Sequence, residues 1–155
     1  MNCLSVNKKI EVALDRFQNG WSCAQVVLCS FCEDYEMDIA TAKSISCGFA
    51  GGMRCGETCG AVSAAIMVIG LWSFHIEKDF TKQQQLCFDT VSRFLAAFER
   101  KQNSCKCKDI LGYDIRDTEE RKKHPGRQRK ICPQVIEDGI QILADCIRCV
   151  GDGKI

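Results

Sequence analysis

Proline and histidine are both scarce in this chain of 155 residues, which has two of each. The prolines, Pro125 and Pro133, come late, so most of the chain is free to form helices. The only histidines, His75 and His124, are too few to favour a Ser-His-Asp triad, a histidine-rich zinc site or a Cys-His protease pair. A C-x-x-C-H motif is also missing, which excludes covalently attached c-type haem.

A strong net charge and a long apolar run are missing as well. The formal net charge is +1, so no overall field attracts nucleic acid or a membrane surface. The longest apolar run, residues 61–72, is too short to span a bilayer and indicates a buried helix. Residues 1–17 contain no apolar stretch of signal-peptide length, so we expect a cytoplasmic protein. Residues 116–130 hold seven Lys/Arg against three Asp/Glu without interleaved aromatics, which predicts a solvated loop rather than a nucleic-acid site.

Strand-like alternation is absent throughout, and apolar residues recur at helical spacing instead. Ser22, Asp38 and Thr58 are candidate helix caps, and Gln25 completes a capping-box pattern with Ser22. We therefore predict an all-α fold of about five to seven helices, in a single bundle-like domain spanning residues 1–155. The expected helices cover residues 6–17, 22–35, 38–46, 58–74, 81–98, 104–112 and 133–150.

Cysteine is abundant, with thirteen residues, an odd number that cannot all pair within one chain. In a reducing compartment, such clusters suggest metal binding or redox work rather than a disulfide scaffold. Four cysteines stand at predicted helix starts, where free backbone N–H groups and the helix dipole favour a thiolate. We expect these four to share one anionic or metal-binding site: Cys23, Cys59, Cys107 and Cys132.

The remaining cysteines have weaker patterns. The C-x-x-C pairs Cys29/Cys32 and Cys146/Cys149 have zinc-ligand spacing, but both fall inside predicted helices, where packing explains them at least as well. Cys55 and Cys105 lie within four residues of a favoured cysteine, so either could replace it or act as a resolving thiol. In a catalytic reading, Cys59 is the nucleophile and Cys55 its resolving partner.

A glycine-rich loop precedes the fourth predicted helix. It lacks the Gly-Lys-Ser/Thr ending of a phosphate-binding loop, and no strand precedes it. The loop is either a tight connection or a close approach of the backbone to the cysteine centre. Gly51, Gly52 and Gly60 are accordingly the candidate residues for contacting a bound group.

These motifs together resemble a bacterial family named for its C-GCAxxG-C-C pattern. The resemblance runs from about residue 14 to 142, and its four cysteines are Cys23, Cys59, Cys107 and Cys132. It implies a redox-active protein with a cofactor such as an iron–sulfur cluster, often encoded near transporters or oxidoreductases. One departure is Ala64, which occupies the position of the motif's closing glycine. The matching segments are residues 20–25 (GWSCAQ), 49–56 (FAGGMRCG), 59–64 (CGAVSA) and 107–114 (CKDILGYD).

Three functions remain open at this stage. The first is electron transfer or redox sensing through a bound iron–sulfur or related metal centre. The second is metal-free thiol–disulfide chemistry, and the third is a structural zinc site in a partner-binding module. The sequence leaves open whether the chain is an enzyme, a component of an oxidoreductase or a carrier that serves a redox partner protein, and whether it forms a homodimer.

Overall fold

The computed structural model describes residues 4–151, with side chains from residue 4 to residue 148. The described residues form eight α-helices and no strand, which confirms the all-α prediction and adds one helix to the seven expected. The predicted single domain is not tested by this count. The helices are α1 (Val6–Gln18), α2 (Cys23–Cys29), α3 (Ile39–Ser46), α4 (Gly60–Ile76), α5 (Phe80–Gln102), α6 (Cys107–Leu111), α7 (Thr118–Lys123) and α8 (Arg127–Gly151).

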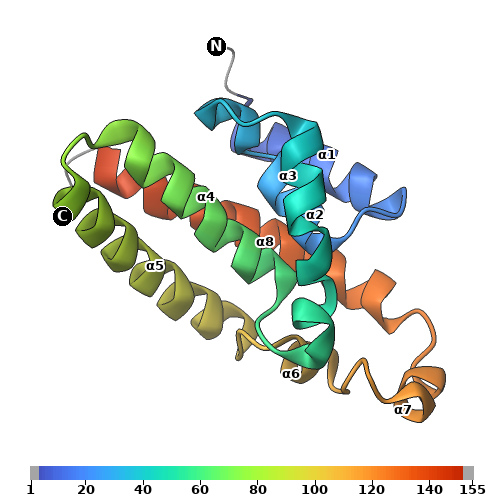
Figure 1. The fold of residues 1–155 in the computed structure, drawn as a ribbon. Helices are drawn as coiled ribbons and strands as arrows, with labels where there is room; N and C mark the ends of the chain where they lie inside the picture. Colours follow the sequence, from blue (N-terminus) through green and yellow to red (C-terminus); the bar gives the residue numbers. More distant parts are fainter. Residues whose placement is uncertain (1–3, 152–155) are drawn as a thin grey trace.

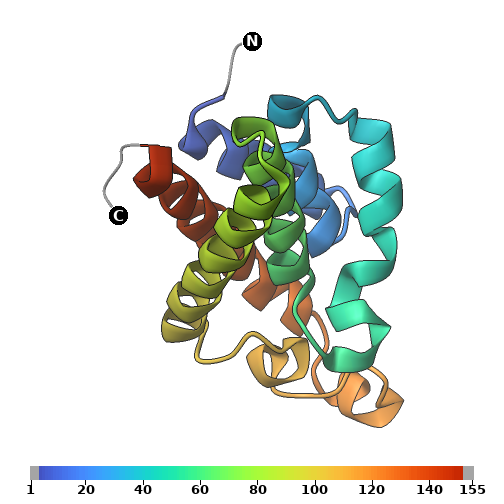
Figure 2. The ribbon, with the colours of Figure 1, turned by 60° about the vertical axis from the view of Figure 1, so that its left-hand side comes forward.

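The long helices α4, α5 and α8 pack against one another, with α5 along one side of the fold and α4 and α8 between it and helices α1 and α2 (Figure 1). Helices α1 and α2 pack on α8, and α2 also packs on α4 and α3. The short helices α6 and α7 lie together near one end of this arrangement, as both views show (Figure 2). The loop between α3 and α4 leads towards that same end.

Several helix starts follow directly from the capping residues. Ser22 accepts a hydrogen bond from the backbone N–H of Gln25, and the Gln25 side chain accepts one from the Ser22 N–H, completing the predicted capping box. Asp38 caps α3 through the Thr41 N–H, as predicted. The cap of α5 is Asp79 and not Thr81, because the Asp79 carboxylate accepts a hydrogen bond from the backbone N–H of Lys82.

The hydrophobic interior has two parts. The main core gathers buried residues of α2, α4, α5 and α8, among them Leu28, Ile69, Phe94 and Ile140. A small second cluster consists of Cys107, Leu111, Tyr113 and Ile115. Ile131 and Cys132 of α8 pack against both parts, so this stretch of α8 joins them.

Two predicted helix boundaries are wrong by six residues each. Helix α2 ends at Cys29 rather than near residue 35, because the Ser30 hydroxyl donates to the Val26 carbonyl and the chain then tightens into a short 3₁₀ helix, Cys32–Tyr35. The last helix begins at Arg127 rather than Pro133, so the proline lies inside α8. The predicted loop 116–130 accordingly contains α7 and the first turn of α8.

Within residues 4–151, no helix is long and apolar enough to cross a membrane. No disulfide joins the cysteines whose side chains the structure describes. The side chain of Cys149, the second half of one C-x-x-C pair, falls outside that described part.

Candidate functional site

One pocket brings together the four cysteines predicted to share a site. Its volume is about 290 Å³, and apolar side chains of α1, α6 and α8 complete its walls. Gly51 and Arg54 of the glycine-rich loop also line it, whereas Cys55 and Cys105 do not. We call it the thiol pocket, defined by Cys23, Cys59, Cys107 and Cys132.

Cys23 enters the pocket as the first residue of α2. The capping box at Ser22 fixes the chain there and leaves the first backbone N–H groups of the helix free. The Cys23 sulfur accepts hydrogen bonds from the backbone N–H groups of Ala24 and of Cys23 itself. It is therefore placed where a thiolate is stabilised.

A left-handed turn carries a third backbone donor to Cys23. Four successive residues, Gly51 to Arg54, have φ values between +54° and +64°. Two of them, Met53 and Arg54, carry side chains, and such a conformation costs about 1–3 kcal/mol at a non-glycine residue. The turn directs the Gly51 N–H to the Cys23 sulfur and places the Arg54 side chain at the pocket.

Cys59 is the residue that caps α4, and the predicted cap Thr58 is wrong. Thr58 instead pairs with Lys106 in an isolated antiparallel bridge. On either side of that bridge, the Cys59 N–H donates to the Cys105 carbonyl at 2.8 Å and the Cys107 N–H donates to the Glu57 carbonyl at 2.7 Å. The pairing places Cys59 and Cys107 on opposite sides of the bridge, and both line the pocket.

Cys107 and Cys132 occupy different helical positions from those expected. Cys107 is the first residue of α6, whose N-cap is Lys106 and not Ser104. Cys132 is the sixth residue of α8 and therefore not a helix start, because α8 begins at Arg127. Pro133 has no N–H to offer the carbonyl four residues back, so α8 tolerates a missing helical hydrogen bond beside the pocket.

Two glycines, Gly52 and Gly60, lie so close to pocket cysteines that a side chain would not fit at either position. A Cβ atom on Gly60 would lie 2.7 Å from the Cys23 sulfur and 2.9 Å from the Phe49 carbonyl oxygen. A Cβ atom on Gly52 would lie 2.8 Å from the Cβ of Cys107. Contact of Gly51, Gly52 and Gly60 with a cofactor stays a prediction, but all three shape the surroundings of the thiols.

Replacing Gly60 with alanine is expected to destabilise the fold by about 1–3 kcal/mol, because the new methyl group displaces the Cys23 sulfur or the Phe49 carbonyl. Gly70 lies on the same helix with nothing within 4 Å of its added Cβ, so Gly70→Ala is the matched control. That control should be neutral or stabilise by up to about 1 kcal/mol. Urea denaturation of both variants measures the difference, and equal midpoints would contradict the packing role of Gly60.

The four thiols have unequal proton affinities. A hydrogen bond from the Cys59 side chain, aided by the three backbone N–H groups, lowers the pKa of Cys23 to about 7 against the opposing effect of burial. The same hydrogen bond raises the pKa of Cys59 well above its usual value, because Cys59 is the donor. Burial raises the pKa of Cys107 to about 11 and that of Cys132 to about 12.

Helix starts therefore do not lower the pKa at all four positions, as the sequence suggested. Only Cys23 has donors enough to outweigh its burial. For Cys107, the nearby Arg54 guanidinium lowers the pKa, but this effect is smaller than those of burial and of Cys23. Near pH 7, Cys23 is therefore about half ionised, while the other three thiols of the pocket are protonated.

The alkylation rate of Cys23 is expected to rise with pH and reach half its maximum near pH 7, because the thiolate is the nucleophile. Cys107 should follow only near pH 11. Pulsed iodoacetamide labelling with peptide mass spectrometry gives both profiles. If Cys59 is labelled before Cys23 at neutral pH, Cys59 is the nucleophile, as the sequence predicts.

Cys55, the predicted resolving thiol, lies outside the lining of the thiol pocket. Its thiol donates to the Gly52 carbonyl at 3.3 Å. The side chain that contacts Cys59 is Cys23, which the sequence did not single out as its partner. Arg54 was also missed, although its position inside the glycine-rich loop was a usable signal.

The fold and pocket define a cysteine-rich, all-helical protein with four thiols around one cavity. A family model described as "Putative redox-active protein (C_GCAxxG_C_C)" matches residues 21–146, and the chain belongs to that family. The matched region contains all four cysteines of the thiol pocket. No curated protein and no solved structure matches the chain.

Proposed function

We propose that this chain is a redox protein in which Cys23 and Cys59 cycle between a dithiol and a disulfide. The observation that supports this best is the direct hydrogen bond between the two side chains, which leaves a thiolate next to a protonated thiol. That pairing is the arrangement that thiol–disulfide exchange requires: one sulfur attacks, and the second resolves the mixed disulfide.

The proposed cycle begins with attack of the Cys23 thiolate on a disulfide of a small molecule or a redox partner protein. A bond forms between Cys23 and one sulfur of that disulfide, and the other sulfur leaves as a thiolate. Cys59 then loses its proton and attacks the Cys23 sulfur, which releases the second half. The protein dithiol is oxidised by two electrons, and the external disulfide is reduced to two thiols.

The test is a redox titration of the purified chain in glutathione buffers, with acid quenching, alkylation and peptide mapping. The expected result is a Cys23–Cys59 disulfide that appears and disappears reversibly as a two-electron couple. Cys107→Ser and Cys132→Ser should leave this couple in place, because neither sulfur takes part in the exchange. Irreversible oxidation, or pairing of Cys59 with Cys55, would overturn the proposal.

A second candidate is an iron–sulfur cluster held by Cys23, Cys59, Cys107 and Cys132. Four thiol donors from separate parts of the chain line one pocket, and Cys₄ is the donor set of such clusters. Within the described residues, no three Cys, His, Asp or Glu side chains are placed to ligate a single metal ion, so zinc would require their rearrangement. In an iron–sulfur cluster, the four thiolates bind different iron ions, so they do not need to converge on a single metal position.

If bound, a cluster would supply one-electron transfer, and the Gly51 N–H donor at Cys23 would tune its potential. Anaerobic purification followed by iron and acid-labile sulfide analysis tests this candidate. The serine variants separate the two functions, because Cys107→Ser or Cys132→Ser should remove a cluster while sparing the dithiol couple. Anaerobic protein that is colourless and resists reconstitution with iron and sulfide would exclude the cluster, and the dithiol cycle would then be the remaining candidate.

A further inference from the structure

Two arginine side chains stand at the rim of the thiol pocket. Arg54 comes from the left-handed turn before α4, and Arg129 comes from the first turn of α8. Both residues are exposed, and within the described part of the chain neither guanidinium forms a hydrogen bond or an ion pair. Both charged groups are therefore available to a ligand that enters the pocket.

The lining of the thiol pocket has no acidic side chain to offset these two charges, as far as residues 4–148 are concerned. Asp114, whose charge acts on Cys107, lies outside the lining and forms an ion pair with Arg116 at 2.6 Å. Even with Cys23 fully ionised, the two arginines leave the lining with a net positive charge. A cleft lined by charge of one sign raises the local concentration of ligands of the opposite sign.

The positively charged surface continues beyond the thiol pocket. A neighbouring pocket of about 390 Å³ shares Gln128 and Arg129 with it and is also lined by Arg121 and Arg127. Among the described residues, no carboxylate lines this second pocket either. A ligand larger than the thiol pocket can therefore extend across Arg129 and remain on a positively charged surface.

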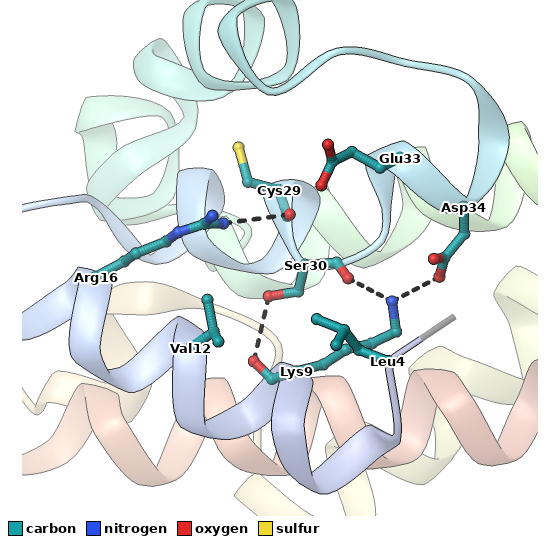
Figure 3. A pocket seen from close by; sticks show the side chains of 8 residues that line it. All are labelled: Leu4, Lys9, Val12, Arg16, Cys29, Ser30, Glu33 and Asp34. Carbon is teal, nitrogen blue, oxygen red and sulfur yellow. Dashed lines mark hydrogen bonds and ion pairs between the residues drawn. The ribbon is translucent and has the colours of Figure 1, made fainter. Parts of the chain in front are cut away.

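The surface pocket between α1 and the end of α2, drawn in Figure 3, has a different balance of charge. It also has two cationic side chains, but Lys9 is paired with Asp34 at 2.6 Å. Arg16 donates to the Cys29 carbonyl at 3.3 Å, and Glu33 lies in the same lining. The cations of that pocket are thus matched by its own carboxylates, whereas those of the thiol pocket are not.

The depth of the pocket thiols favours a small substrate over a disulfide on a folded protein. Cys59 and Cys107 are each 6% exposed, and Cys23 is half-buried. A reagent has to enter the cavity of about 290 Å³ to reach them. Trp21 and Ile110 supply apolar wall for its carbon chain, and a few polar groups on apolar walls are typical of small-molecule sites.

We propose that the thiol pocket takes a low-molecular-weight disulfide that carries carboxylates, which Arg54 and Arg129 bind. This rests on the dithiol cycle proposed above. The Cys23 thiolate attacks one sulfur of the disulfide, and the other sulfur leaves as a thiolate with its carboxylate attached. Cys59 then gives up its proton and attacks the Cys23 sulfur. The protein loses two electrons, and the substrate becomes two carboxylate-bearing thiols, one protonated by Cys59 and the other by solvent.

Iodoacetate and iodoacetamide test the charge preference without a redox step, because they are similar in size and differ by one negative charge. The measurement is the ratio of their alkylation rates at Cys23, by peptide mass spectrometry at pH 7, divided by the same ratio for the neutral thiol N-acetylcysteinamide. We expect a normalised ratio of at least about five at low salt, falling towards about one in about 0.5 M salt. A ratio of one at low salt would overturn the proposal and leave the Cys23–Cys59 cycle untouched.

Substitutions at the rim test the two arginines directly. Arg54→Gln with Arg129→Gln should reduce the normalised ratio to about one, whereas Arg54→Lys with Arg129→Lys should retain most of it. A change in the thiolate fraction of Cys23 cancels, because both rates refer to the same thiol. The matched control is Lys130→Gln, since Lys130 is exposed, adjacent to Arg129 and outside both pockets. An equal loss in that control would refute a specific role for the rim arginines.

A series of small disulfides identifies the substrate class. Dithiodipropionate is dianionic, hydroxyethyl disulfide is neutral and cystamine is dicationic. The rate at which each forms the Cys23–Cys59 disulfide, normalised to its rate with the same neutral thiol, should be at least about tenfold higher for dithiodipropionate than for cystamine. Equal rates would refute the carboxylate preference and leave the cycle intact. A preference in alkylation without a Cys23–Cys59 disulfide from any of the three would overturn the cycle, and with it the disulfide as substrate.

Discussion

Cys23→Ser is expected to slow the reaction of the pocket thiols with a small disulfide at pH 7 by about two orders of magnitude. Cys23, with a pKa of about 7, is roughly half thiolate at that pH. Cys107, with a pKa of about 11, is thiolate in about one molecule in 10⁴. The higher basicity of such a thiolate makes it a better nucleophile and recovers about a factor of 10² of that difference.

Cys59→Ser should behave differently from Cys23→Ser. The serine hydroxyl can still donate to the Cys23 sulfur, so attack should proceed at a similar rate. Resolution is lost, so the mixed disulfide on Cys23 should accumulate instead of being released. Stopped-flow kinetics with a chromogenic disulfide, followed by intact mass, distinguishes the two variants. Cys87→Ser on α5, outside the thiol pocket, is the control and should match the unsubstituted chain.

Two outcomes would contradict this division of roles. If Cys55→Ser and not Cys59→Ser traps the mixed disulfide, the sequence-based choice of resolving thiol is right. If Cys23→Ser retains full reactivity, the nucleophile lies elsewhere in the chain. The pH dependence of the rate provides an independent check, because only attack by Cys23 should have its midpoint near pH 7.

Asp34→Ala is expected to lower the free energy of unfolding by about 3 kcal/mol, because it leaves a buried ammonium group without its counter-charge. Lys9 of α1 is 5% exposed, and its Nζ donates to the Asp34 carboxylate at 2.6 Å and to the Ser30 carbonyl at 2.7 Å. The ammonium group also lies 4.7 Å from the centre of the Phe31 ring. The contacts of Lys9 with Ser30 and Asp34, drawn in Figure 3, tie α1 to the segment that follows α2.

The neighbouring residue supplies a matched control. Lys8 forms an ion pair with Glu11 at 2.7 Å, but both side chains are largely exposed. Glu11→Ala should therefore cost no more than about 1 kcal/mol. Lys9→Met combined with Asp34→Ala should recover much of the loss, because no charge then remains buried. If the double variant is as unstable as Asp34→Ala in urea denaturation, buried charge is not the cause.

Local signals in the sequence predicted most of the fold. Helices α1, α3 and α4 lie close to their predicted positions because their apolar residues recur at helical spacing, and Ser22 and Asp38 set the starts of α2 and α3 as predicted. The start of α8 was wrong because Pro133 resembles a first helical residue, whereas tertiary packing extends the helix through a polar turn before it. Helix α7 was missed because its residues are nearly all charged and have no apolar stripe.

The sequence predicts which cysteines line the thiol pocket, but it does not predict which of them ionises. Helix position and the family pattern together pointed to Cys23, Cys59, Cys107 and Cys132. Which of them ionises depends on burial and on donors such as the Gly51 N–H, which only the folded chain brings together. The hydrogen bond between Cys23 and Cys59 joins residues far apart in sequence and has no local signature.

The bridge between residues 57–59 and 105–107 has a consequence for the order in which the protein is made. It joins segments on either side of α4 and α5, such as Glu57 and Lys108, which are 51 positions apart and linked by a 3.1 Å ion pair. Closing so large a loop costs entropy, which only the contacts made afterwards repay. Cys23 and Cys59 emerge from the ribosome well before Cys107 and Cys132, so a growing chain displays half of its pocket thiols first. Until those later residues are made, Cys23 and Cys59 lack the α6 and α8 walls that enclose them in the finished pocket.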